Sequence, residues 1–138
     1  MSFDPEEWLA VAEVCCGKIP SVNREALLRT ALNRAYYAAL LTLKLRIESA
    51  QGEGAVPNWQ THDAIKQAVR MGGLTFNEIA RRLNELRLLR EQADYVLNSA
   101  ELQWDRVHRA VRTARTLIRN QIKALPEAEF RRLRVPRT

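Results

Sequence analysis

The fold of this chain is decided by the stretch Leu28-Arg29-Thr30-Ala31-Leu32-Asn33-Arg34-Ala35-Tyr36-Tyr37-Ala38-Ala39-Leu40. Its apolar residues recur at the three- and four-residue spacing of an amphipathic helix and form an unusually wide stripe. We therefore predict that residues 21–48 form one long helix, the most buried of the protein. Its small residues would let neighbouring helices approach closely: Ala31, Ala35, Ala38 and Ala39.

On the N-terminal side of this stretch, the sequence predicts one further helix. Asp4 is the expected N-cap, and Pro5 suits the first helical position. The acidic residues that follow, Glu6 and Glu7, favour the positive end of the helix dipole. We expect this helix to end near Gly17.

On the C-terminal side, glycines and capping residues separate the next two helices. After a loop over residues 50–60, Thr61 is the expected cap of a short helix that stops at the glycine pair 72–73. Thr75 and Glu78 have the spacing of a capping box, which predicts the start of a fourth helix.

A fifth helix carries apolar residues from Trp104 to Leu125 on one face, and Pro126 ends it. With 138 residues and no strand-like alternation, the chain is expected to form one all-α domain. We predict an up-and-down four-helix bundle with a short additional helix over residues 1–126. Residues 127–138 would follow as a basic C-terminal tail.

Composition excludes several classes of protein. The longest apolar run, residues 35–43, is too short to span a membrane, and the acidic N-terminus is unlike a basic signal peptide. We therefore expect a cytoplasmic location. Cys15 and Cys16 are adjacent and lack any metal-ligand spacing, so we expect no metal and no cofactor.

The positive charge is concentrated near the C-terminus. Residues 1–100 hold 12 Lys and Arg against 12 Asp and Glu, whereas residues 101–138 hold 10 against 4. This asymmetry indicates an anionic partner, and the basic side chains could follow an RNA backbone. The alternative is an ordinary solvated helix face. The basic residues recur by threes and fours: Arg109, Arg112, Arg115, Arg119 and Lys123.

Polar residues on two separate helices indicate a functional site. Arg34 lies in the middle of the predicted buried helix, where an arginine costs several kcal/mol unless it finds a partner. Arg90, Asp94 and Tyr95 cluster near the end of the fourth helix. Arg90 could bind a phosphate there, while Tyr95 stacks or hydrogen-bonds.

Asn33, Arg34 and Tyr37 would complete the same pocket from the neighbouring helix. The structural alternative is a local ion pair, because Arg90 and Asp94 have the i,i+4 spacing of a helical salt bridge. The two histidines, His62 and His108, have no carboxylate at a fixed spacing, and we expect both to be packing residues.

Three motifs in this order resemble the HEPN family. They are Arg-Ala-Tyr-Tyr-Ala at 34–38, Thr-His at 61–62, and Arg-x-x-Ala-Asp-Tyr at 90–95. The resemblance covers roughly residues 24 to 125. It implies a small all-α bundle that is often dimeric.

The resemblance also implies a function. Many HEPN members are metal-independent ribonucleases or RNA-binding partners of a minimal nucleotidyltransferase in a toxin–antitoxin pair. The ribonucleases place a histidine after their arginine, whereas Tyr95 stands at that position here. A tyrosine, with a pKa near 10, matches proton transfer at neutral pH poorly.

Two functions therefore follow as expectations. The first is a homodimeric, cytoplasmic RNA-binding protein and candidate ribonuclease toxin, in which Arg90, Asp94 and Tyr95 serve catalysis. The second is a non-catalytic helical module that binds a nucleotidyltransferase or another protein partner.

Overall fold

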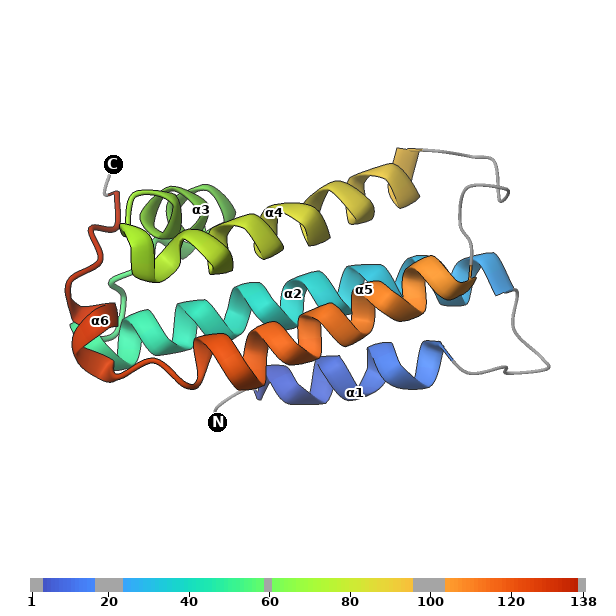
Figure 1. The fold of residues 1–138 in the computed structure, drawn as a ribbon, viewed down its shortest axis with the longest axis horizontal. Helices are drawn as coiled ribbons and strands as arrows, with labels where there is room; N and C mark the ends of the chain where they lie inside the picture. Colours follow the sequence, from blue (N-terminus) through green and yellow to red (C-terminus); the bar gives the residue numbers. More distant parts are fainter. Residues whose placement is uncertain (1–3, 17–23, 59–60, 96–103, 137–138) are drawn as a thin grey trace.

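The computed structural model describes residues 4–16, 24–58, 61–95 and 104–136, with backbone alone at residues 24–25, 93–95 and 104. In this part of the chain every regular element is a helix, which confirms the predicted all-α class (Figure 1). None of the described helices has the length and apolarity needed to cross a membrane. The elements are α1 (Pro5–Cys15), α2 (Arg24–Gln51), α3 (Thr61–Arg70), α4 (Leu74–Tyr95), α5 (Trp104–Thr116), the π-helical segment η3 (Leu117–Ile122) and α6 (Glu127–Arg131).

The long helix α2 is the centre of the fold and contacts every other helical element. In Figure 1, α1, α4 and α5 run lengthwise beside it, α3 is seen nearly end-on next to α4, and α6 lies at one end of α2. The alanines expected to allow close approach are fully buried: Ala31, Ala35, Ala38 and Ala39. Close helix packing around α2 follows from these small side chains.

The start of α1 agrees with its capping sequence. The Asp4 carboxylate accepts a hydrogen bond from the Glu6 backbone N–H at 3.0 Å, as an N-cap should. The predicted start of α2 at Ser21 lies outside the described residues. The other end of α2 continues to Gln51, three residues beyond the predicted limit.

Two capping predictions were wrong. Thr61 is the first residue of α3, and its hydroxyl donates to the Pro57 carbonyl oxygen at 2.8 Å rather than capping the helix. Helix α4 begins at Leu74, directly after Gly73, whose φ of 80° a side chain would strain. The Glu78 carboxylate accepts hydrogen bonds from Arg81 and Arg82 instead of closing a capping box with Thr75.

The predicted fifth helix is not uniform. Its α-helical part ends at Thr116, and η3 continues with wider turns until the Lys123 N–H donates to the Ile118 carbonyl oxygen. The apolar side chains Leu117, Ile118 and Ile122 are all buried. This segment ends at Ile122, four residues before Pro126, which was predicted to end it and is instead the N-cap of α6.

Residues 127–136, expected to form a basic tail, pack on the same core as the helices. Phe130 is fully buried, and its ring meets Phe76 edge-on at 5.5 Å. The Gln51 amide donates to the carbonyl oxygens of Phe130 and Leu133 at 2.9 and 2.7 Å. Arg46 lies over the Phe130 ring at 4.8 Å. The end of α2 therefore holds this segment through both apolar and polar contacts.

Replacement of Phe130 by alanine should lower the free energy of unfolding by about 3–5 kcal/mol, the usual cost of emptying an aromatic core site. Chemical denaturation followed by circular dichroism measures the loss. The adjacent Arg131 has a side chain that is 63% exposed, and its replacement by alanine should change stability by less than about 0.5 kcal/mol. A loss below about 1 kcal/mol for Phe130→Ala would contradict this packing.

Candidate functional site

Four side chains from three helices meet beside the middle of α2. We call them the Arg90 cluster: Tyr36 and Tyr37 of α2, His62 of α3 and Arg90 of α4. The two tyrosine rings meet edge-on at 5.4 Å, and Tyr37 meets the His62 ring edge-on at 5.1 Å. The cluster joins a cation, an imidazole and two phenols within a few ångströms.

Arg90 is held mainly by aromatic faces. Its guanidinium carbon lies 5.0 Å from the centre of the Tyr36 ring and 5.4 Å from that of Tyr37, within the range of cation–π attraction. Its Nη1 donates to the Tyr37 hydroxyl at a long 3.4 Å, and its buried Nε has no hydrogen-bond partner within the described part of the chain. Part of the donor capacity of this guanidinium is therefore unused.

His62 is neutral in this environment. Burial lowers the pKa of its imidazole below the usual 6.5, and the charge of Arg90 lowers it further. Its Nδ1 lies 3.3 Å from the Tyr36 hydroxyl. Burial also raises the pKa of Tyr36 to about 12, so this hydroxyl keeps its proton at neutral pH. The cluster thus holds a neutral base beside a permanent cation.

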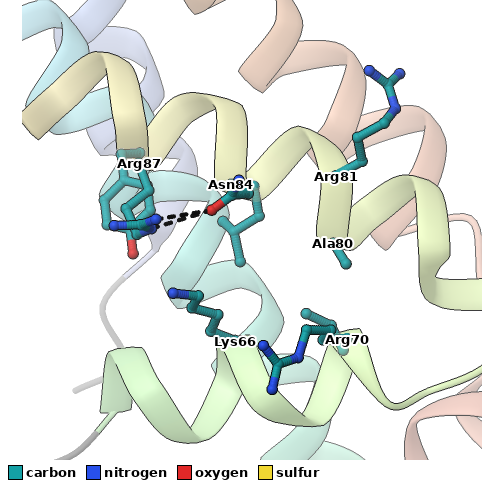
Figure 2. Close-up of a pocket in the computed structure, with 9 residues that line it drawn as sticks. Lys66, Arg70, Ala80, Arg81, Asn84 and Arg87 are labelled. Carbon is teal, nitrogen blue, oxygen red and sulfur yellow. Dashed lines mark hydrogen bonds between the residues drawn. The ribbon is translucent and has the colours of Figure 1, made fainter. Parts of the chain in front are cut away.

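Two cavities border the cluster. One, of about 440 Å³, lies against Tyr37 and His62 and also meets Lys44, Thr61 and Asp63. The other, of about 380 Å³, lies between α3 and α4 and reaches Tyr36. We call the second one the α3–α4 cavity; Figure 2 shows the labelled basic side chains of both helices around it. A ligand in either cavity would touch a member of the Arg90 cluster.

The structure brings together only some of the predicted site residues. Tyr37 meets Arg90, as the two-helix pocket required. Arg34 instead lies over the ring of Trp8 on α1 at 4.5 Å, and Trp8 meets Tyr37 edge-on at 5.8 Å. Asn33 is partly exposed on α2. Arg34 therefore joins the site through Trp8 and not through direct contact with Arg90.

Two of the predicted catalytic side chains, Asp94 and Tyr95, lie outside the described residues, although the backbone of α4 extends to Tyr95. Their roles, and the predicted Arg90–Asp94 ion pair, stay predictions.

The basic residues of the last long helix fall into two groups. Arg109 and Arg112 are exposed, and Arg115 is partly exposed. Arg119 instead bonds Glu6 of α1 at 3.1 Å, and Lys123 lies 3.4 Å from the same carboxylate. The hydrogen bond from Arg119 lowers the pKa of Glu6. The second group therefore ties α1 to the C-terminal helices.

His62 is a candidate site residue to which the sequence analysis assigned only a packing role. Its Thr-His motif placed it at the start of a helix, but only the packing of α3 beside α2 sets its ring against two tyrosines. Within the described part of the chain, no group of three His, Cys, Asp or Glu side chains could hold a metal ion.

We expect the His62 imidazole to titrate below its usual 6.5. Two-dimensional NMR measures this, and His62→Gln identifies the resonance. Because the folded-state pKa is lowered, protonation favours the unfolded chain. The stability that neutral His62 contributes is present above pH 6.5 and is lost as the pH falls through the folded-state pKa. Acidification should therefore destabilise the wild type more than His62→Gln, and a titration at or above 6.5 would contradict the described environment.

No protein-family model, curated protein or solved structure matches this chain. The resemblance to the HEPN family therefore depends on the three sequence motifs, and the function is inferred from the geometry of the Arg90 cluster.

Proposed function

We propose that this protein binds RNA as a HEPN-like up-and-down four-helix bundle, with the Arg90 cluster as its phosphate site. One observation carries the proposal: Arg90 is fixed against two tyrosine rings, while its buried Nε has no hydrogen-bond partner among the described residues. A buried unmet donor is costly, and an anion would satisfy it. The guanidinium fork matches the oxygens of a phosphate.

The neighbouring groups suit a ribonucleotide. Tyr37 offers a hydroxyl and a ring edge beside a cavity that also meets Lys44 and Asn58. Proteins commonly recognise single-stranded RNA by placing bases on aromatic side chains and phosphates on arginines. Arg90 would hold the backbone while a base lies near Tyr37.

The cluster also supplies a base for RNA cleavage, which the Arg-x-x-Ala-Asp-Tyr element lacks. Neutral His62 would take the proton of a 2′-hydroxyl, whose oxygen would attack the adjacent phosphorus. The bond from phosphorus to the 5′-oxygen would break, and that oxygen would leave with a proton from water. This role requires Nδ1–H to donate to the Tyr36 hydroxyl, so that Nε2 is the basic nitrogen.

The wider assembly belongs to the same proposal. A HEPN-like protein would act as a homodimer, with a nucleotidyltransferase as its protein partner in a toxin–antitoxin pair. The exposed arginines of α5, Arg109 and Arg112, would extend the contact along the RNA backbone.

A second candidate function is a non-catalytic interaction module, and exposed apolar side chains favour it. Met71 and Leu74 flank the turn between α3 and α4 and are 72% and 90% exposed. Adjacent exposed apolar residues of this size are typical of protein contact sites. In this alternative the turn would contact a protein partner and the protein would not cleave RNA.

Replacement of Arg90 by alanine should weaken RNA binding about 10- to 100-fold, the equivalent of one or two charge-assisted hydrogen bonds. Arg90→Lys should recover only part of this, because lysine has no planar fork. Fluorescence anisotropy with a labelled single-stranded RNA measures the affinity. Arg82→Ala is the matched control on the same helix, because Arg82 bonds Glu78 at 2.8 Å away from the cluster. Equal affinities for Arg90→Ala and Arg82→Ala would reject the proposed site.

Cleavage and binding are separated by His62→Asn. This variant should bind RNA with little change but lose cleavage, measured by gel electrophoresis of a labelled RNA in the presence of EDTA. Tyr36→Phe should shift the pH profile of cleavage, because the hydroxyl fixes the His62 tautomer. RNA binding without cleavage in the wild type would leave the binding proposal and reject the ribonuclease.

Salt dependence tests the arginines of α5. Each phosphate contact lowers the slope of log affinity against log salt by roughly one unit. Arg112→Glu and Arg115→Glu should therefore each weaken binding and make the slope shallower for every RNA sequence alike. Arg131→Glu on α6 is the control, and an effect of the same size there would mean that only net charge matters.

A further inference from the structure

The α3–α4 cavity has a chemical character of its own. It is a hollow of about 380 Å³ between the two helices, and Tyr36 of α2 also lines it. Its volume lies within the range of small-molecule sites. Apolar side chains line its inner part: Val69, Ala80, Leu83 and the ring of Tyr36.

Basic side chains surround this apolar floor. Figure 2 shows Lys66 extending from α3 toward α4, Arg70 lying along α3, and Arg87 beside Asn84 on the opposite side. Arg81 points away from α3 in the same view, and it bonds Glu78 and Glu85 at 2.6 Å each. The charge of Arg81 is therefore neutralised by these two carboxylates outside the cavity.

The remaining cations differ in how well they are neutralised. Arg87 bonds the Glu91 carboxylate at 2.6 Å and the Asn84 amide oxygen at 3.0 Å. Lys66 and Arg70 make no ion pair with a described carboxylate. They stand four residues apart on one face of α3, where like charges repel. An anion between them would relieve this repulsion.

We propose that the α3–α4 cavity binds a nucleoside phosphate. The flat base would lie on the apolar floor at Ala80 and Leu83, and the phosphate would bind Lys66 and Arg70 at the rim. The Asn84 side chain, held by Arg87, lies where it can meet the polar edge of the base. The source of the ligand is a free mononucleotide or one unit of an RNA chain, and both present the same chemistry.

This cavity is separate from the proposed phosphate site at Arg90, which does not line it. The proposal therefore stands if Arg90 has no role in RNA binding. Tyr36 connects the two proposed sites. Its ring lies under Arg90, and the same residue lines the α3–α4 cavity.

Isothermal titration calorimetry with AMP and UMP tests the proposal, with inorganic phosphate and adenosine as half-ligands. AMP and UMP should bind more tightly than inorganic phosphate or adenosine. Only the nucleotides can contact both the apolar side chains and the pair Lys66 and Arg70. Lys66→Glu and Arg70→Glu should each weaken nucleotide binding by about tenfold or more. Arg106→Glu, a reversal at an exposed residue of α5, should leave it unchanged.

Filling the floor provides a second, independent variant. Ala80→Phe should abolish nucleotide binding while every cation remains, whereas Ala80→Ser should retain it because the cavity stays open. Circular dichroism and thermal unfolding confirm the fold of each variant. If Ala80→Phe fails to fold, the charge reversals on α3 still decide the question.

The two sources are distinguished by chain length. Equal affinity for AMP and a tetranucleotide indicates a free mononucleotide, and affinity that rises with length and is lost in Ala80→Phe indicates RNA. Arg90→Ala should leave AMP binding intact, which keeps this site distinct from the Arg90 cluster. The proposal is overturned if AMP and UMP do not bind at millimolar concentration, or if Arg70→Glu and Ala80→Phe bind them like the wild type.

Discussion

Every other helical element of the described chain packs on α2, and the side chains on its packed faces are buried. Polar groups on such a helix must find partners inside the protein. Thr42 donates its hydroxyl to the Ala38 carbonyl oxygen at 2.7 Å within the helix itself. Tyr36 has no such local partner and depends on His62 and Arg90, which arrive from α3 and α4. The candidate site is thus a consequence of burying a tyrosine on the central helix.

The sequence predicted the fold correctly where the role of a residue depends only on its position in its own helix. The wide apolar stripe predicted the burial of α2, and Asp4 predicted the start of α1. The predictions at Thr61 and Thr75 failed because capping depends on where the preceding backbone runs, and the glycine turn moved the start of α4 to Leu74. The π-helical segment was missed because an α-helix, with bonds from residue i to i−4, and a single π-helical turn, with bonds from i to i−5, bury apolar residues at nearly the same spacing.

For the candidate site, the sequence predicted only the contact between α2 and α4, the two helices that carry the Arg-Ala-Tyr-Tyr-Ala and Arg-x-x-Ala-Asp-Tyr motifs. The sequence motifs indicated that Arg90 would share a pocket with Asn33, Arg34 and Tyr37 of α2, and it lies within hydrogen-bond distance of Tyr37. His62 was assigned a packing role because the sequence showed no carboxylate at a fixed spacing that would pair with it. Its partners come from residues 26 positions away, and no local spacing encodes such a contact. The same holds for Arg34, whose guanidinium lies over the ring of Trp8 on α1.

The contacts of Arg46 and Gln51 with residues 125–133 have a consequence for protein synthesis. These contacts join positions about 80 residues apart, so a ribosome must complete most of the chain before the end of α2 is covered. Until then the nascent polypeptide leaves Phe76 and the apolar surface around Ile47 exposed to water. Such surface is what chaperones bind and what drives aggregation of incomplete chains. Mutations that weaken the Phe130 contact would therefore lower the yield of folded protein more than its final activity.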